Sequence, residues 1–108
     1  LLLQMLVNNL LENAHKYAPQ DTEIKVILAA YGKHVKLEVM DSGKGIPDTE
    51  KSKIFEKFYR IGSEATRNTK GTGLGLYLCK KIAENHNANI SVTDNKPQGS
   101  IFVVTFNS

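Results

Sequence analysis

Apolar residues recur every three or four positions over residues 2–18, which predicts an amphipathic helix. Because a helix turns by about 100° per residue, these positions fall on one face. They are Leu3, Leu6, Leu10, Ala14 and Tyr17. Pro19 follows and ends the helix, because proline has no backbone N–H to donate.

Over residues 23–30 the apolar positions instead recur at every second residue, which predicts a half-buried strand. Its inward positions are Ile24, Val26, Leu28 and Ala30. The glycine-containing stretch 31–33 has the composition of a turn, and alternation resumes after it at Val35, Leu37 and Val39. Two alternating runs joined by a short turn predict a β-hairpin.

The second half of the chain predicts two more helices separated by a loop. Residues 49–60 are expected to form a short helix that carries Ile54, Phe55, Phe58 and Tyr59. Residues 61–70 are polar and small without periodicity, which is typical of a mobile loop. A longer helix is expected over residues 74–87, with Leu74, Leu78 and Ile82 on its inner side.

Two strands complete the pattern, one around Ile90 and Val92 and one over residues 100–106, with a turn at 94–99 between them. Helices on one face of such a sheet form a two-layer α+β sandwich. The sheet is expected to be mixed but mostly antiparallel. A chain of 108 residues suffices for one core, so we treat residues 1–108 as one domain.

Composition narrows the classes of function. The net charge of +3 is mild and the lysines are scattered, so no basic stripe predicts nucleic-acid binding. No run of 18 apolar residues occurs, so we expect no direct contact between this domain and a membrane. The single cysteine, Cys79, excludes an internal disulfide, fits a reducing compartment such as the cytoplasm, and is expected to be buried as a small apolar residue.

Three polar residues of the predicted first helix do not fit a plain amphipathic pattern. Asn9 and Asn13 lie four residues apart and therefore on one face, with Lys16 on the same side. Asparagine is a poor helix former, and a buried amide is costly unless it is hydrogen bonded. The pair is either two tolerated surface residues, a capping network, or part of a binding site.

Asp41 continues the alternation of the preceding strand, so its side chain is expected to face the core. A buried carboxylate needs a hydrogen-bond donor. The amine of an adenine is one such donor, since Gly43 and Gly45 would let the backbone approach a ligand and Ile46 could cover its ring. The alternative is an Asx turn, in which Asp41 accepts from its own backbone.

A third unusual stretch places Gly71, Gly73 and Gly75 at alternate positions directly before the second long helix. Free N–H groups and the positive end of the dipole make a helix start suitable for a phosphate. The spacing matches neither the P-loop nor the dinucleotide fingerprint, whose last glycine is replaced by Leu76. The alternative is a flexible linker into the helix.

Four motifs, in this order, resemble those of sensor histidine kinases and cover most of the chain. The N box of that family is similar to residues 9–19, NLLENAHKYAP, and the first glycine box to residues 41–47, DSGKGIP. The F box is similar to residues 54–60, IFEKFYR, and the second glycine box to residues 71–82, GTGLGLYLCKKI. The resemblance is to the ATP-binding catalytic domain, whose fold is shared with DNA gyrase, a heat-shock chaperone and a mismatch-repair ATPase.

The resemblance implies ATP and Mg²⁺ as cofactors and assigns roles to matching residues. Asn13 would be the Mg²⁺ ligand that bridges to the phosphates, Asn9 would support it, and Lys16 would contact a phosphate. These three residues form the expected catalytic group, and Asp41 would accept from the adenine amine. Other expected nucleotide-binding residues are Tyr17, Gly43, Gly45, Ile46, Phe55, Phe58, Arg60, Gly71, Thr72, Gly73, Leu74, Gly75 and Leu76. Phe55 and Phe58 would also anchor a lid over residues 60–72.

The resemblance also bears on the reaction. ATP-hydrolysing relatives typically carry a water-activating glutamate four positions before the magnesium asparagine, where this chain has Asn9, which cannot act as a general base. Glu12 is expected to face away from Asn13. Transfer of the γ-phosphoryl group to a protein acceptor is therefore favoured over hydrolysis, and the resemblance implies that this acceptor is a histidine.

The partners implied by the resemblance lie outside this chain. Its three histidines, His15, His34 and His86, are in no acceptor motif, so the acceptor is expected on the dimerisation helices of the parent kinase. A response regulator would act downstream of that parent, which can be membrane-anchored while this domain is cytoplasmic. We expect the chain to be a fragment, because its helical rhythm starts without an N-cap residue.

Two departures from the family and three alternatives remain. The strand and helix that normally precede the N box are missing, which predicts an exposed sheet edge. Asn87 replaces the usual glycine after the last helix and can adopt the left-handed conformation. The alternatives are a serine kinase of the same fold (the anti-sigma-factor type), a nucleotide-sensing module without catalysis, and a purely structural domain.

Overall fold

The computed structural model describes residues 2–57, 59 and 75–107. The expectations for the loop at 61–70 and for Phe58, Arg60, Gly71, Thr72, Gly73 and Leu74 therefore lie outside the described residues, as does the side chain of Tyr17. The elements are α1 (Leu2–Tyr17), β1 (Lys25–Tyr31), β2 (His34–Met40), η1 (Asp48–Glu50), η2 (Lys53–Phe55), α2 (Gly75–Asn85), β3 (Ala88–Asp94) and β4 (Ser100–Asn107).

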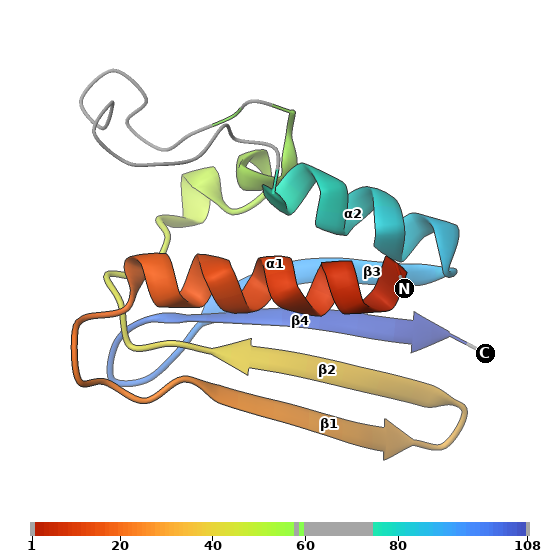
Figure 1. Cartoon of the computed structure of the whole chain (residues 1–108), viewed down its shortest axis with the longest axis horizontal. Helices are drawn as coiled ribbons and strands as arrows, with labels where there is room; N and C mark the ends of the chain where they lie inside the picture. Colours follow the sequence, from red (N-terminus) through yellow and green to blue (C-terminus); the bar gives the residue numbers. More distant parts are fainter. Residues whose placement is uncertain (1, 58, 60–74, 108) are drawn as a thin grey trace.

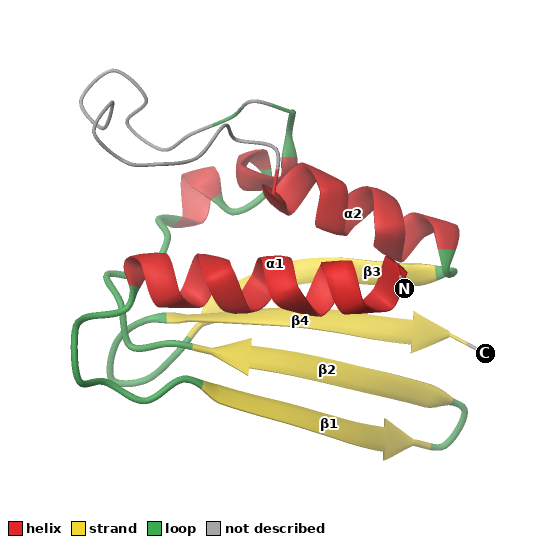
Figure 2. Ribbon diagram, viewed as in Figure 1, coloured by secondary structure: helices red, strands yellow, loops and turns green. Residues whose placement is uncertain are grey.

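The helices and the strands form two layers (Figure 1). α1 and α2 pack against each other on one face of the sheet, as the colouring by secondary structure makes clear in Figure 2. The two helices run antiparallel, and the N-terminal end of α2 lies beside the middle of α1, whose last turns extend beyond it. The expected two-layer α+β sandwich is confirmed. Neither of these described helices combines the length and the apolar character needed to cross a membrane.

The strands are ordered β1-β2-β4-β3. Each neighbouring pair in the described sheet is antiparallel, in agreement with the prediction of a mostly antiparallel sheet, and the described strands include no parallel pair. Val39 pairs with Phe102 and Leu37 with Val104 across the two central strands. Every second residue of a strand points to the same face of the sheet. These four apolar residues therefore form a continuous surface beneath the helices.

The core lies between the two helices and the central strands. Its largest fully buried side chains are Leu6, Leu10, Val39, Cys79, Phe102 and Val104. Phe55 packs edge-to-face on Phe102, with ring centroids 6.2 Å apart and planes at 85°. Burial of Cys79 confirms its prediction as a small apolar core residue.

The predicted faces of the two helices are only partly right. Leu6, Leu10 and Ala14 are buried as expected, but Leu3 is exposed near the beginning of α1. On α2 the buried residues are Cys79, Ile82 and Ala83, whereas Leu78 is exposed. Leu78 lies about 100° around the helix from Cys79, so it falls at the margin of the buried stripe.

The prediction of one short helix over residues 49–60 is wrong. Two separate 3₁₀ turns, η1 and η2, occupy this region and are closed by i to i+3 hydrogen bonds, such as Glu50 N–H to Pro47 O at 2.9 Å. Ile54 and Phe55 are nevertheless buried as predicted. The chain bends between the turns at Lys51, whose side chain reaches back to the carbonyl oxygen of Ile46.

The prediction that β1 is half buried is also wrong. Val26 and Leu28 pair with Val39 and Leu37 and so lie on the helix-facing side of the sheet, yet they are 47% and 69% exposed. The alternation correctly identified the strand and its face. It could not show that α1 packs over the neighbouring strand β2 and leaves β1 uncovered.

Candidate functional site

Asp41 directly follows β2 and is buried, with only 3% of its surface exposed. Its backbone N–H donates to the carbonyl oxygen of Ser100 at 3.0 Å, which continues the β2–β4 ladder by one residue. One carboxylate oxygen, Oδ1, accepts from the backbone N–H of Gly43 at 2.8 Å. The predicted burial of Asp41 is confirmed, and so is the Asx turn that was the alternative to an adenine contact. The adenine contact itself stays a prediction.

The turn between β3 and β4 contacts the backbone of Asp41 and holds it in place. The side-chain Nδ2 of Asn95 donates to the carbonyl oxygen of Asp41 at 2.8 Å. Gly99 has φ +119°, and a Cβ atom there would lie 2.0 Å from that same oxygen. Neither Asn95 nor Gly99 was predicted to belong to the site. The signal was present in the turn-forming stretch at 94–99, but the contact joins residues more than fifty positions apart.

Gly45 adopts a left-handed conformation with φ +80°. A Cβ atom there would lie 3.2 Å from the carbonyl oxygen of Gly99, so a side chain at this position would be both strained and crowded. The next residue, Ile46, is partly buried and packs against the core. The glycine therefore lets the segment after Asp41 run close to the β3–β4 turn.

Lys51 holds this segment from its other end. Its Nζ donates to the carbonyl oxygen of Ile46 at 2.9 Å and lies 3.0 Å from Oδ1 of Asp94, and it also hydrogen bonds to Asp48. The hydrogen bonds to Asp48 and Asp94 raise the pKa of Lys51, and the contact with Lys51 lowers the pKa of Asp48. Residues 41–51 are thus fixed to the end of β3 and its turn at both ends of the segment.

A polar contact links α1 to α2 beside the core. The thiol Sγ of Cys79 donates to the carbonyl oxygen of Leu6 at 3.6 Å, and the side chain of Asn9 lies close enough to Cys79 to affect its pKa. Burial raises the pKa of the Cys79 thiol to about 12, and the hydrogen bond from Asn9 opposes that rise only in part. Asn9 therefore faces α2.

Asn13 lies one turn further along α1 on the same face as Asn9. Asn13 is half-buried. Lys16 follows in the exposed last turn of α1. Glu12 is exposed, in agreement with the expectation that it faces away from Asn13.

The remaining described candidates differ in their surroundings. Phe55 is buried against Phe102, so it anchors the segment before residue 60 within the core. Leu76 is partly buried against the core, whereas Gly75 is exposed. A Cβ atom on Gly75 would meet no atom of the described residues within 4 Å, so they provide no steric reason for a glycine there.

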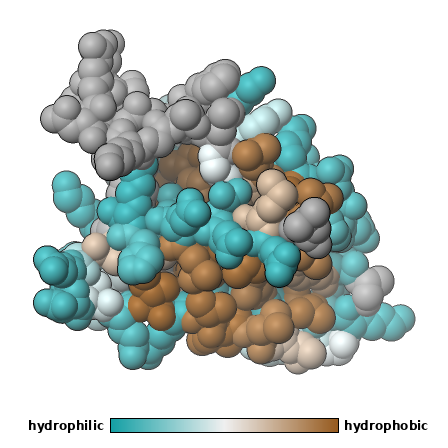
Figure 3. Space-filling model, viewed as in Figure 1, coloured by the Kyte–Doolittle hydropathy of each residue, from teal (hydrophilic) through white to brown (hydrophobic). Residues whose placement is uncertain are grey.

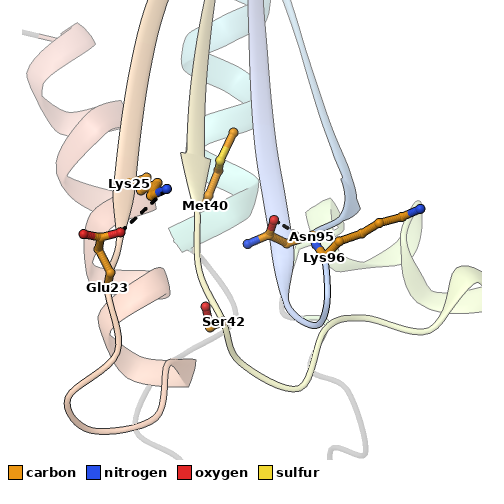
Figure 4. Close-up of a pocket in the computed structure, with 6 residues that line it drawn as sticks. All are labelled: Glu23, Lys25, Met40, Ser42, Asn95 and Lys96. Carbon is orange, nitrogen blue, oxygen red and sulfur yellow. Dashed lines mark hydrogen bonds and ion pairs between the residues drawn. The ribbon is translucent and has the colours of Figure 1, made fainter.

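A pocket of about 190 Å³ lies at the same end of the sheet, but none of the predicted site residues lines it (Figure 4). Lys25 and Met40 form part of its wall. These two residues are paired and alternate with Val26 and Val39, which face the helices. The pocket therefore opens on the opposite face of the sheet from the core, and its polar walls show no feature that would bind an adenine ring.

The described residues fit an adenine nucleotide and a magnesium ion in their chemistry. The carboxylate of Asp41 is fixed in a buried position, and a fixed buried acceptor suits a ligand that brings an N–H donor. The amide of Asn13 supplies the kind of oxygen ligand that Mg²⁺ prefers, and this ion usually keeps several waters. A single protein oxygen is therefore sufficient when phosphate oxygens complete the coordination.

Comparison with known proteins gives one consistent picture. Residues 1–108 match the family described as histidine kinase-, DNA gyrase B-, and HSP90-like ATPase. The sensor protein CiaH of Streptococcus pneumoniae is 43% identical over 104 residues, which cover 96% of this chain and 23% of CiaH. The mycobacterial sensor histidine kinase MprB has a TM-score of 0.83 at 30% identity, over 95% of this chain and 68% of that one. Full-length ShkA in complex with AMPPNP shares the fold, with a TM-score of 0.83 at 23% identity over 97% of this chain and 21% of that one.

Proposed function

The chain belongs to the histidine kinase-, DNA gyrase B- and HSP90-like ATPase family, and we propose that it binds ATP with Mg²⁺ as the catalytic domain of a sensor histidine kinase. The observation that carries the proposal is the buried Asp41, whose carboxylate accepts from Gly43 and whose backbone carbonyl accepts from Asn95 of the β3–β4 turn. CiaH and MprB are sensor proteins by name, and ShkA was crystallised with an ATP analogue, which supports the same assignment.

Adenine binding is assigned to the end of β2. Asp41 accepts a hydrogen bond from the adenine amine, since its Oδ2 is not used by the Gly43 contact. Ile46 supplies an apolar side chain next to the ring, and Gly45 lets the backbone follow the ligand closely. Tyr17 contributes from the end of α1. Lys51 and Asn95 keep this segment in place without contacting the nucleotide.

Phosphate binding is assigned to the space between the end of α1 and the beginning of α2. Asn13 provides the oxygen ligand for Mg²⁺, which neutralises charge on the phosphate oxygens when bound. Lys16 adds a positive charge at the exposed end of the same helix. The free N–H groups at the N-terminal end of α2 favour an anion there. The proposal also includes the glycine-rich segment 71–75, Arg60 and a lid over residues 60–72 anchored by Phe55 and Phe58.

The reaction we propose is transfer of the γ-phosphoryl group to a histidine of separate dimerisation helices, with a response regulator downstream. Asn9 occupies the position where a general base would be needed for hydrolysis, and its side chain is engaged with Cys79. Glu12 is exposed on another face of α1. Phosphoryl transfer relies mainly on positioning and charge stabilisation, so a site without its own base is consistent with this reaction.

Calorimetric titration with a non-hydrolysable ATP analogue, with and without Mg²⁺, tests the proposal. Asp41→Asn replaces one acceptor oxygen with a donor and should weaken binding at least tenfold under both conditions. Asn13→Ala should remove mainly the Mg²⁺-dependent part of the affinity. Asn8→Ala, on the exposed side of α1, is the matched control and should bind as the original chain does. Absence of binding by the folded chain, or equal affinities for all variants, would contradict the assignment.

The phosphoryl acceptor is tested separately with radiolabelled ATP. We expect negligible label on the chain alone and transfer to an added dimerisation-helix pair that carries an acceptor histidine. Stable label on the chain itself would refute this part of the proposal. Label on an added serine-containing substrate instead would favour a serine kinase of the same fold.

A further inference from the structure

Three hydrogen bonds hold Asp41, and one of them comes from a side chain that is distant in the sequence. The backbone N–H of Asp41 donates to the carbonyl oxygen of Ser100 at 3.0 Å, and its Oδ1 accepts from the backbone N–H of Gly43 at 2.8 Å. The carbonyl oxygen of Asp41 accepts from Nδ2 of Asn95, also at 2.8 Å. Figure 4 shows the Asn95 side chain pointing from the β3–β4 turn toward the end of β2. Of these three partners only Asn95 uses its side chain, so this is the bond that a substitution can remove.

Asn95 is itself fixed within the turn. Its Oδ1 accepts from the backbone N–H of Lys96 at 2.9 Å, and its own backbone N–H donates to the carbonyl oxygen of Gly99 at 2.9 Å. Both polar atoms of the amide are therefore used, with the oxygen toward the turn and the nitrogen toward Asp41. Residues 96–98 are exposed, and the loops at this end of the sheet are covered mainly by hydrophilic side chains in the view of Figure 3. Hydrogen bonds, and not burial of apolar side chains, therefore join Asn95 to Asp41.

The bond from Asn95 restrains the part of Asp41 that determines where its carboxylate lies. The N–H and C=O groups of Asp41 flank the Cα atom that carries the side chain. Because β4 binds the first group and the turn binds the second, both backbone dihedral angles of Asp41 are restrained. Oδ1 is engaged by Gly43, whereas Oδ2 takes no part in that bond and can accept from a ligand. A displacement of about 1 Å at such an acceptor weakens a hydrogen bond severely.

We propose that Asn95 is a positioning residue that determines the nucleobase specificity of the site, because its amide holds Asp41 where Oδ2 accepts from the exocyclic amine of adenine. This inference rests on the proposed function, in which Asp41 accepts from that amine. Inosine carries an oxygen in place of the amine and so presents an acceptor where Asp41 requires a donor. A site built around a buried acceptor rejects such an analogue, because the acceptor is left unpaired.

The ratio of the affinities for ADP and for inosine diphosphate (IDP) measures the placement of Asp41. The two nucleotides share the ribose and both phosphates. A variant that is merely less stable, or that adds a charge near the phosphates, should weaken both nucleotides alike and leave the ratio unchanged. A displaced Asp41 carboxylate should weaken ADP selectively.

Asn95→Asp removes the bond to Asp41 and keeps the shape of the side chain. It retains the oxygen that accepts from Lys96, but it places an oxygen instead of Nδ2 against the Asp41 carbonyl. In calorimetric titrations of the 108-residue chain, we expect the original protein to prefer ADP over IDP at least about tenfold. Asn95→Asp should lower this preference at least about threefold. Asn89→Asp makes the same chemical change at an exposed position of β3 and should keep the original preference.

A double-mutant cycle tests whether Asn95 acts through Asp41. Asp41→Asn should abolish the preference for ADP, because it replaces an acceptor oxygen with a donor. In that background Asn95→Asp should not change the ratio further, since the residue through which it acts has already lost its function. A further change in the ratio would show that Asn95 affects the base by another route and would overturn the inference.

Hydrogen exchange of the original chain tests the same coupling without any substitution. If the Asn95 bond favours adenine binding, adenine binding must favour that bond to the same extent. Saturating ADP should therefore slow exchange of the Asn95 backbone N–H, which bonds to Gly99 within the turn, more than saturating IDP does. Equal protection by the two nucleotides would overturn the coupling.

The outcomes separate this inference from the proposed function. If the folded original chain bound neither nucleotide, or bound both equally, adenine recognition by Asp41 would be contradicted and the inference would fail with it. A clear preference for ADP that Asn95→Asp leaves unchanged would support the proposed function and overturn the role of Asn95 alone. Circular dichroism of each variant verifies that the comparison is made between folded proteins.

Discussion

Gly99 packs so closely on Asp41 that a Cβ atom would lie 2.0 Å from the aspartate carbonyl oxygen. The backbone of Gly99 also has φ +119°, a region that residues with a side chain rarely adopt. The β3–β4 turn therefore fixes the position of the carboxylate from outside the motif that contains it. Substitution of Gly99 should consequently disturb the nucleotide site that we propose at Asp41.

We predict that Gly99→Ala lowers the free energy of unfolding by about 2–4 kcal/mol, since it combines backbone strain with a clash. Binding of an ATP analogue should weaken as well, because the turn must move away from Asp41. Gly32→Ala is the matched control. Gly32 has φ +60°, but a Cβ atom there would meet no described atom within 4 Å, so this variant should lose only about 1 kcal/mol. Denaturant unfolding measures both variants, and equal losses would contradict the role of the clash.

Lys51→Met should loosen the segment that follows Asp41 while keeping a long side chain. The variant loses the hydrogen bonds to Ile46 and Asp48 and the ion pair with Asp94. We expect the melting temperature to fall by a few degrees and affinity for an ATP analogue to fall several-fold at neutral pH. Lys81→Met removes only an exposed ion pair with Glu84 at 3.7 Å, so it should change neither quantity measurably.

The effect of Lys51 should also depend on pH in a defined direction. The pKa of Asp48 is lowered from 3.8, so its contribution is present above that value and is lost as the pH falls through the lowered pKa. The pKa of Lys51 is raised from 10.5, so its contribution is lost only as the pH rises through the raised value. The difference in melting temperature between the original chain and Lys51→Met should therefore shrink at acid pH. A difference that grows on acidification would contradict this.

Local patterns predicted most of the elements and the position of Asp41. The alternation through Leu37 and Val39 placed the carboxylate on the core side, and the structure confirms it. The same rule wrongly predicted that Leu28 is buried. Alternation identifies which face of the sheet a residue lies on, but not whether another element covers that face. Asn87 has φ 56°, as its place after the helix predicted.

These local patterns could not predict contacts between segments that are distant in the sequence. Asn95 and Gly99 act on Asp41 through the tertiary structure, and neither belongs to one of the four motifs found in the sequence. In the sequence Lys51 resembles an ordinary surface lysine, yet its Nζ contacts three oxygen atoms, from Ile46, Asp48 and Asp94. Its bond to the Ile46 carbonyl also accompanies the bend that divides the predicted helix into η1 and η2.

Cys79 should be unreactive in the folded chain. Its side chain is fully buried and its pKa is raised to about 12, so the thiolate that reacts with thiol reagents is scarce at pH values where the fold persists. We expect no modification by a disulfide reagent at mildly alkaline pH in the native state and one equivalent after unfolding in denaturant. Rapid modification of the native chain would show that α1 and α2 separate readily.

The same residue predicts a loss of stability at high pH. The unfolded thiol ionises near its usual pKa of 9.0, whereas the folded thiol does so only near 12, so stability due to Cys79 is complete below 9.0 and declines between the two values. The slope from this group is at most about 1.4 kcal/mol per pH unit. Cys79→Ala should lack this component when unfolding free energies are compared across that range. Parallel curves for the two proteins would contradict the prediction.

Phe55→Leu should destabilise the fold although Phe55 belongs to a segment predicted to contact nucleotide. The ring is 6% exposed and packs edge-to-face on Phe102 at 6.2 Å, so the substitution removes aromatic contact and leaves unfilled space. We expect a loss of about 1–2 kcal/mol in the free energy of unfolding. Leu28→Ala, at a position that is 69% exposed, should change it by less than about 0.5 kcal/mol. If the Phe55 variant kept full stability and lost only nucleotide affinity, the ring would be a ligand contact and not the core anchor that its packing indicates.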